Sequence, residues 1–172
     1  MGSAESAWFE RVFSEHYDLI VHYALRRTGT WEDAADAAAE TLLVAWRRRD
    51  TAPAGDAVRA WLYGIARRVL ANQARTGRRQ ERLIARLRAE PILVEQSADR
   101  TRDPVWEALR RLKPADRDIL ILTAVEGLSP TEVAVVLECS AVSARVRLHR
   151  ARTRLAREMQ LPVSGRQHQR TS

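Results

Sequence analysis

Arginines are concentrated near the C-terminal end of the sequence, in a pattern suited to binding nucleic acid. Six of them fall between residues 141 and 158, namely Arg145, Arg147, Arg150, Arg152, Arg154 and Arg157. A guanidinium group presents a planar fork of hydrogen-bond donors, which matches a phosphate group or the edge of a guanine base. The alternative is an amphipathic helix whose charges are simply solvated, so the neighbouring residues must decide between the two.

The residues around this run predict a helix-turn-helix. The stretch Ser129-Pro130-Thr131-Glu132 has the pattern of a capping box, with proline at the first helical position. A break at residues 138–140 separates the short helix that it opens from a basic helix at about residues 141–158. A helix of about 18 residues is roughly 27 Å long, enough to cross a major groove. Because these features occur in this order, we expect the arginines to contact DNA.

Residues for catalysis or metal binding are not grouped in the sequence. The seven glycines are scattered and form no loop that could cradle a phosphate, and the four histidines have no metal-ligand spacing. Cys139 is the only cysteine, which excludes an internal disulfide. We therefore expect no catalytic residue, no metal and no cofactor, and a function performed by binding alone.

Charge alternates along the chain in four blocks. Residues 1–43 have a net charge of −5, residues 44–88 of +9, residues 89–144 of −4 and residues 145–172 of +7, within a formal net charge of +7. A uniformly solvated surface would not normally alternate in this way. The pattern indicates two modules, each with a DNA-facing end and a less basic end.

Apolar periodicity predicts helices throughout the N-terminal part. The first spans about residues 6–27 and ends at Gly29, and Thr30 with Asp33 forms an N-cap pair for a second helix to about residue 49. The inner stripe of the second helix is predicted as Trp31, Ala35, Ala38, Leu42, Ala45 and Trp46. A loop follows, and a third helix spans residues 57–76, where Gly77 interrupts it before a further charged helical segment.

The fold class predicted is all-α, with two small helical domains joined by a flexible linker. We assign the first domain to residues 6–80, the linker to 81–103, the second domain to 104–160 and a polar tail to 161–172. No apolar run approaches the roughly 20 residues that span a bilayer, and the N-terminus lacks a signal-peptide core. We expect no membrane insertion and a cytoplasmic location.

Two parts of the sequence resemble the extracytoplasmic-function (ECF, group 4) RNA polymerase sigma factors of the sigma-70 family. The stretches EDAADAAAETLLVAWRRR and RAWLYGIARRVLANQAR are similar to their region 2, and LKPADRDILILTAVEGLSPTEVAVVLECSAVSARVRLHRARTRL is similar to their region 4. The resemblance covers about residues 9–79 and 104–158, in the order of the family. A single helix-turn-helix is common among regulators, whereas two matching domains in one short chain are specific.

The resemblance implies promoter recognition in transcription initiation. Region 2 would bind core RNA polymerase and recognise and melt the −10 element, and region 4 would recognise the −35 element. The implied partners are the β′ clamp helices and β flap of the core enzyme, the −35 duplex and the −10 non-template strand, with an anti-sigma factor as a further candidate. When bound to polymerase, the protein would be associated with the nucleoid.

Where residues of this chain match the family's motifs, the resemblance implies the functions of those residues. For core polymerase binding they are Asp36, Glu40 and Leu43. For the −10 element they are Asp50, Thr51, Ala52, Pro53, Ala54, Gly55 and Asp56 in a loop that accepts a flipped base, and Arg59, Arg67, Arg68, Asn72 and Arg75 in the next helix. For the −35 element they are Ser143, Arg145, Val146, Arg147, His149, Arg150 and Arg154.

The chain departs from the family pattern at a few positions. Residues 37–39 are alanines where the family usually has bulkier residues and a glutamine, and Arg68 often has an asparagine in its place. Glu138 lies where glycine is usual in the turn, and a positive φ there would cost on the order of a kilocalorie.

Two other functions compete with the sigma factor. A stand-alone helix-turn-helix regulator would bind an operator tightly as a dimer without polymerase. A DNA-processing enzyme such as a recombinase would need a nucleophile or metal site, for which the sequence has no candidate.

Overall fold

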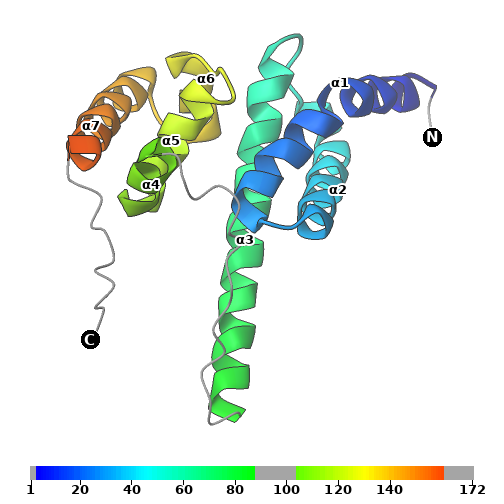
Figure 1. Cartoon of the computed structure of the whole chain (residues 1–172). Coiled ribbons are helices and arrows are strands. Elements are labelled where there is room, and N and C mark those ends of the chain that lie inside the picture. Colours follow the sequence, from blue (N-terminus) through cyan, green and yellow to red (C-terminus); the bar gives the residue numbers. More distant parts are fainter. Residues whose placement is uncertain (1–2, 88–103, 161–172) are drawn as a thin grey trace, which may run out of the picture.

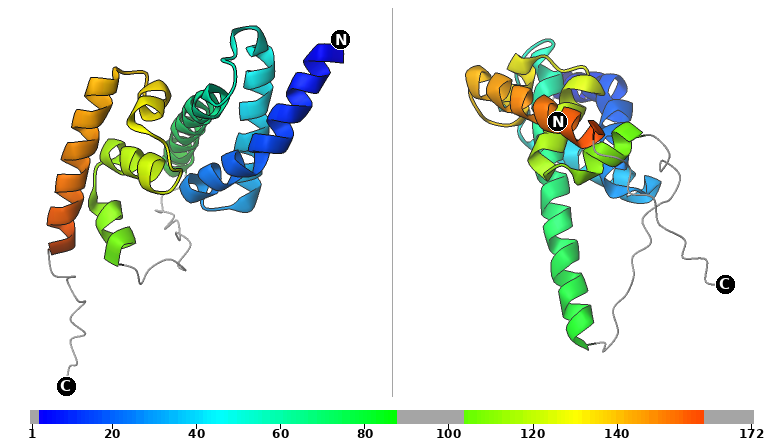
Figure 2. Two further views of the ribbon diagram at one scale, coloured as in Figure 1. Left: turned by 90° about the horizontal axis from the view of Figure 1, so that it is seen from above. Right: turned by 60° about the vertical axis from the view of Figure 1, so that its left-hand side comes forward.

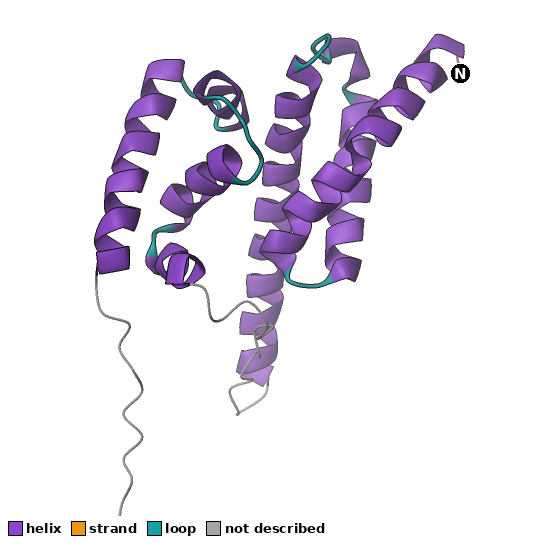
Figure 3. Cartoon of the chain, turned by 45° about the horizontal axis from the view of Figure 1, so that its top comes forward, coloured by secondary structure: helices purple, strands orange, loops and turns teal. Residues whose placement is uncertain are grey.

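The N-terminal half is built from three helices. The computed structural model describes residues 3–87 and 104–160, and these residues contain helices and loops but no strand (Figures 1 and 3). Helix α1 (Ser3–Thr28) and helix α2 (Trp31–Arg47) are followed by a short 3-10 turn, η1 (Arg49–Thr51), and by helix α3 (Ala57–Leu87). The all-α fold class predicted from the apolar periodicity is therefore confirmed.

A tight corner joins α1 to α2. Gly29 has a φ of 86°, a left-handed conformation that glycine adopts without a steric penalty. The Thr30 hydroxyl then accepts a hydrogen bond from the Asp33 amide at 3.2 Å and donates one to the Asp33 carboxylate at 2.5 Å. The predicted N-cap pair is thus confirmed, and it returns α2 along α1, on which it packs.

The inward face of α2 agrees with the predicted stripe at Ala38, Leu42 and Ala45 and departs from it at Trp31. Its buried residues are Ala34, Ala37, Ala38, Thr41, Leu42 and Ala45. Trp31, predicted to be inward, is 60% exposed. Trp31 is the first residue of the helix, and its ring lies edge-on to His22 of α1, with centroids 6.2 Å apart. The alanines let the helices approach closely because their side chains are small.

Helix α3 is longer than predicted. It continues through Gly77 to Leu87, so the predicted interruption at Gly77 is wrong, and residues 81–87 of the predicted linker are helical. Glycine lowers helix stability by about 1 kcal/mol but does not by itself end a helix. In Figure 1 the C-terminal part of α3 extends beyond the other helices. The rest of the predicted linker and the tail from residue 161 lie outside the described residues.

The C-terminal half contains four helices among the described residues. They are α4 (Pro104–Arg111), α5 (Pro114–Ala124), α6 (Pro130–Val136) and α7 (Ala141–Gln160). The capping box is confirmed, since the Ser129 hydroxyl accepts from the Glu132 amide at 3.3 Å and the Glu132 carboxylate accepts from the Ser129 amide at 2.8 Å. Helices α4, α5 and α6 all pack on α7, so the long basic helix has one covered face.

The two halves are in contact, which the sequence did not predict. Helix α6 packs on α3, and the views in Figures 1 and 2 show the C-terminal helices on one side of α3 and α1 with α2 on the other. Gly64 of α3 faces α6, and an added Cβ there would be 3.8 Å from the Cα of Val136. This contact decides which functional residues remain accessible.

Candidate nucleic-acid and polymerase interfaces

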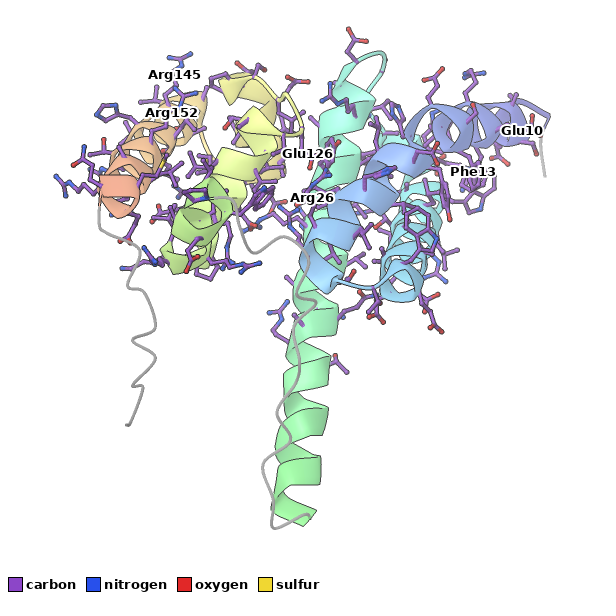
Figure 4. The ribbon with its side chains drawn as sticks, viewed as in Figure 1. Glu10, Phe13, Arg26, Glu126, Arg145 and Arg152 are labelled. Atoms are coloured by element: carbon purple, nitrogen blue, oxygen red, sulfur yellow. The ribbon has the colours of Figure 1, made fainter. Side chains whose placement is uncertain are left out.

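The outer face of α7 is an open basic surface. Ala144, Leu148 and Ala151 are buried against the neighbouring helices, and the residues between them are directed away. Arg145, Val146, Arg147, His149 and Arg150 are all exposed. Figure 4 shows Arg145 and Arg152 on the side of the molecule away from α3. The predicted −35 residues of α7 are therefore brought to one accessible surface.

Two predicted −35 residues make contacts inside the C-terminal half. The Ser143 hydroxyl lies 3.0 Å from that of Ser140, whose oxygen also accepts from the Ser143 amide at 3.1 Å as a cap of α7. Arg154 donates to the Asp116 carboxylate of α5 at 2.6 Å. This ion pair ties α7 to α5, although other donors of the guanidinium remain for a phosphate.

The turn of the helix-turn-helix has the strained backbone that the sequence suggested. Glu138 has a φ of 52° and is the only described non-glycine residue with positive φ. A side chain there costs energy because its Cβ approaches the following carbonyl. The carboxylate of Glu138 forms an ion pair with Arg68 of α3, so this strained residue also contacts the other half of the molecule.

Three of the four α3 arginines predicted to contact the −10 strand are paired in this structure. The Arg59 guanidinium donates to the backbone carbonyl of Glu126, the Arg67 Nε lies 3.7 Å from the Asp118 carboxylate, and Arg68 pairs with Glu138. All three acceptors belong to the C-terminal half. The three arginines thus lie along one side of α3, where oxygens of the C-terminal half contact them.

The remaining −10 residues of α3 border a shallow groove. Asn72 and Arg75 are exposed and line a cavity of about 350 Å³ together with Arg68 and with Glu40 of α2. Gln73 donates to the Glu40 carboxylate at 3.1 Å. Glu40, predicted to bind polymerase, thus lies at the edge of the predicted DNA surface, which neither set of sequence motifs indicated.

The loop predicted to accept a flipped base forms one wall of a cleft. Residues 52–56 border a cavity of about 770 Å³, whose other walls come from α1, including His16, and from the start of α3, including Arg59. Burial lowers the pKa of His16, and the Arg59 charge acts in the same direction while Glu15 opposes it. Glu132 of α6 also borders this cleft. The loop residues Asp50 and Thr51 belong to η1.

An apolar groove lies beside the predicted polymerase-binding residues. Asp36 and Glu40 are exposed on α2, and Leu43 is 46% exposed. Leu43 borders a groove of about 620 Å³ between α1 and α2, whose lining is mainly apolar and aromatic. Phe9, Phe13, Tyr17 and Trp46 supply its aromatic residues, and Phe13 is 45% exposed.

The sequence prediction placed Trp46 on the inward stripe of its helix and did not identify the groove. Phe13 stacks on Tyr17 with ring centroids 4.8 Å apart, and Phe9 meets Trp46 edge to face at 5.4 Å. The sequence signal that could have indicated the groove was the spacing of residues 9, 13 and 17. This spacing places three aromatic rings along one edge of α1, and their apolar surface is larger than a single alanine-rich helix can cover.

A buried polar cluster between the halves was also missed. The Glu126 carboxylate, whose side chain is 4% exposed, accepts from Arg26 of α1 and from the Tyr63 hydroxyl of α3, the latter at 2.9 Å. Burial and the nearby Glu126 charge raise the pKa of Tyr63. Figure 4 shows Arg26 and Glu126 between the two halves. In the sequence, Glu126 is only an acidic residue at the end of a helix, and no residue at helical spacing indicates its partners.

The described ranges hold neither a candidate metal cluster nor a membrane-spanning helix. Residues 3–87 and 104–160 contain no group of three or more His, Cys, Asp or Glu side chains that could hold a metal ion. None of the helices in those ranges is long and apolar enough to cross a bilayer.

Comparison with known proteins identifies both halves. Residues 12–80 match the family model described as sigma-70 region 2, and residues 102–155 match that of sigma-70 region 4. These matches define a two-module DNA-binding protein of the sigma-70 class, a class of regulators and not of enzymes. The chain belongs to the extracytoplasmic-function RNA polymerase sigma factors. It is 32% identical over 161 residues to the ECF RNA polymerase sigma factor SigL of Mycobacterium tuberculosis, covering 87% of each chain.

Other relatives agree with this assignment. The chain is 29% identical over 160 residues to the RNA polymerase sigma factor YlaC of Bacillus subtilis, covering 87% of this chain and 91% of that one. The fold is similar to that of the sigma factor RpoE of Bartonella quintana in complex with the anti-sigma factor NepR, with a TM-score of 0.66 at 23% identity, over 90% of this chain and 98% of that chain. As an ECF sigma factor, the protein binds core RNA polymerase and directs promoter recognition, DNA melting and transcription initiation.

Proposed function

We propose that the two halves divide promoter recognition, with the −35 element bound by α7. The supporting observation is the open basic side of α7, on which Arg145 and Arg150, about 1.4 helical turns apart, are both exposed. Bidentate pairing of an arginine with a guanine requires an accessible guanidinium on an element that fits the major groove. Arg147 and Arg154 would contact the flanking phosphates. The C-terminal module, residues 104–160, would also contact the β flap.

The −10 element would be bound by the N-terminal module, residues 6–80. The cleft beside loop residues 52–56 has the volume to accept a base, and Arg59 at its border can contact the adjacent backbone. Arg67, Arg68, Asn72 and Arg75 continue along α3 and would follow the phosphates of the displaced strand. Which base the loop prefers depends on small side chains and backbone groups, since Ala52, Pro53, Ala54 and Gly55 offer few side-chain donors.

Core polymerase would dock on α2 and the apolar groove. Asp36 and Glu40 supply charge on one face of α2, and the exposed Leu43 with the ring of Phe13 supplies apolar surface next to it. A helical partner with basic and apolar residues, such as the clamp helices, fits this combination. An anti-sigma factor is a candidate competitor for these surfaces, as the RpoE relative of similar fold is bound by one.

The protein would act by binding alone, without a catalytic step of its own. We place the protein in the cytoplasm, where core polymerase and the chromosome are, and on the nucleoid when it is bound to polymerase. The residue set of the described interfaces contains donors for phosphates and bases but no paired nucleophile and base.

Run-off transcription with sigma-free core polymerase tests the proposal. The protein should direct initiation from a defined start site, and Arg145→Ala with Arg150→Ala should weaken use of promoters that depend on the −35 element. Each substitution should cost about 1–3 kcal/mol in binding if the contact is bidentate. Arg157→Ala is the matched control, because it removes the same charge from the last turn of α7.

Two outcomes would contradict the proposal. Transcription that never depends on the added protein would exclude the sigma-factor role. Tight operator binding by a dimer in the absence of polymerase would instead favour the stand-alone regulator.

A further inference from the structure

Two valines are exposed on the helix that we assign to the −35 duplex. Val142 and Val146 of α7 are 66% and 43% exposed, although valine is an apolar residue. Both lie in the first two turns of the helix, after the cap at Ser140. The N-terminal residues of a recognition helix are those that approach base edges, so the two valines are candidates for contact with DNA.

Helical geometry places the two valines at the centre of the outer face of α7. Successive residues of an α-helix are about 100° apart around its axis. Val146 is two residues from both Ala144 and Leu148, which are buried, and so lies about 160° around the axis from each. Val142 precedes Val146 by four residues and therefore lies on the same face, one turn away. We call this pair the valine ridge.

Arginines flank the valine ridge on both sides. Arg145 directly follows the buried Ala144, and it lies on one flank of the ridge. Arg147 directly precedes the buried Leu148, and it lies on the opposite flank. Both arginines are exposed. A helix inserted with this face toward a duplex directs the ridge to the floor of the major groove and the arginines toward its walls and bordering phosphates.

The fold gives no reason for valine at these two positions. Neither side chain belongs to the core of the described residues, to which α7 contributes Ala144, Leu148 and Ala151. A β-branched residue also forms a helix less well than alanine. Single exposed apolar residues are ordinary on a protein surface, but these two form one apolar strip within a basic surface. Such a surface fits a ligand that is apolar at its centre and anionic at its edges.

Thymine in duplex DNA has this combination of properties. Its C5-methyl group is an apolar feature of the major groove, where the other bases present hydrogen-bond donors and acceptors. Phosphates border the groove on both sides. Apolar side chains one helical turn apart can contact such a methyl group without any hydrogen bond. Arginines pair instead with guanine, so the two kinds of side chain on α7 recognise different bases.

We propose that the valine ridge recognises thymine methyl groups in the −35 duplex, so that Val142 and Val146 determine a preference for T·A pairs that the arginines of α7 do not supply. This inference rests on the −35 role proposed above for α7. It adds Val142 to the DNA contacts and names the group that Val146 contacts. The contact buries apolar surface, so it should depend little on salt, unlike contacts between arginines and phosphates.

Replacement of thymine by uracil tests the contact, because it removes one methyl group and leaves the base pair and every charge in place. Each thymine of the −35 element, on either strand, is replaced in turn in a promoter duplex whose start site has been mapped with this protein. Holoenzyme affinity is measured by competition at two fixed salt concentrations. At least one replacement should weaken binding about threefold to fivefold, as expected for one buried methyl group, and by the same factor at both concentrations.

Truncation of the valines is the second arm. Holoenzyme that contains Val142→Ala and Val146→Ala should bind the thymine and uracil duplexes equally, and no more tightly than the unsubstituted protein binds the uracil duplex. Val125→Ala is the matched control, because it removes the same atoms from an exposed valine outside α7 and should keep the thymine preference. The α7 substitutions raise helix propensity, so the melting temperature should not fall.

Several results would overturn the proposal. They are a −35 element without thymine, uracil duplexes bound as tightly as thymine duplexes, and a thymine preference that survives loss of both valines. If the valine substitutions impair core binding while that preference persists, the ridge contacts polymerase instead. A clearly lower melting temperature of the double variant would assign the valines to the fold.

Failure of the −35 assignment has a different signature. Arg145→Ala should weaken binding of the thymine and uracil duplexes by the same factor and leave their ratio unchanged. If Arg145→Ala weakens binding and uracil does not, the −35 role of α7 stands and the role of the valine ridge is wrong. If neither change alters the affinity, the −35 role itself is wrong.

Discussion

The backbone of the helix-turn-helix turn provides a quantitative test of the structure. Glu138 has a φ of 52°, in the left-handed region that costs a residue with a side chain about 1–2 kcal/mol and glycine nothing. Glycine gives back about 0.5–1 kcal/mol through the larger entropy of its unfolded chain. We therefore expect Glu138→Gly to be more stable than Glu138→Ala by roughly 0.5–1 kcal/mol.

Comparing these two variants isolates the backbone contribution. Both lose the ion pair with Arg68, whose side chains are 48% and 62% exposed and which contributes little. The difference between them then reflects the φ penalty less the unfolded-chain entropy of glycine. It should appear as a melting temperature higher by about 2–4 °C for Glu138→Gly, measured by far-ultraviolet circular dichroism, with urea unfolding as the second measurement. Equal stability, or a more stable Glu138→Ala, would show that the turn does not require a left-handed residue.

The remaining predictions concern DNA, polymerase and pH. Arg145→Ala should weaken binding of the holoenzyme to a −35 duplex by about 1–3 kcal/mol and leave core binding unchanged in a gel-filtration assay. Asp36→Arg, and separately Leu43→Asp, should impair core binding and spare DNA contacts; loss of both steps in one variant would contradict the division of surfaces. Hydrogen bonds from Ser129 lower the pKa of Glu132, so its contribution to stability is complete above about pH 4.5 and is lost as the pH falls through the lowered pKa. Ser129→Ala should cost about 1 kcal/mol at neutral pH and flatten the acid side of a stability–pH profile; an unchanged profile would refute the linkage.

Local signals determined most of the helices and both DNA-binding elements. The capping box at Ser129 and Glu132, the N-cap at Thr30 and the arginine spacing of α7 all depend on residues within one or two turns, so the sequence contains them completely. The positive φ of Glu138 could be anticipated for the same reason. Local rules failed at Gly77, where the helical residues on both sides outweigh one glycine.

Which side of a helix is covered, and which distant residues pair, depended on the tertiary structure. Periodicity states that one side of α1 is apolar, but only the small alanines of α2 leave Phe13 uncovered and open a groove. Pairing of Arg67 with Asp118 and of Tyr63 with Glu126 joins residues far apart in the chain, and no spacing rule relates them. Sequence alone predicted two basic surfaces, because charge and helix periodicity are local. The packing of α6 on α3 decided that Arg59, Arg67 and Arg68 pair with oxygens of the C-terminal half, because it depends on how two separately folded surfaces complement each other.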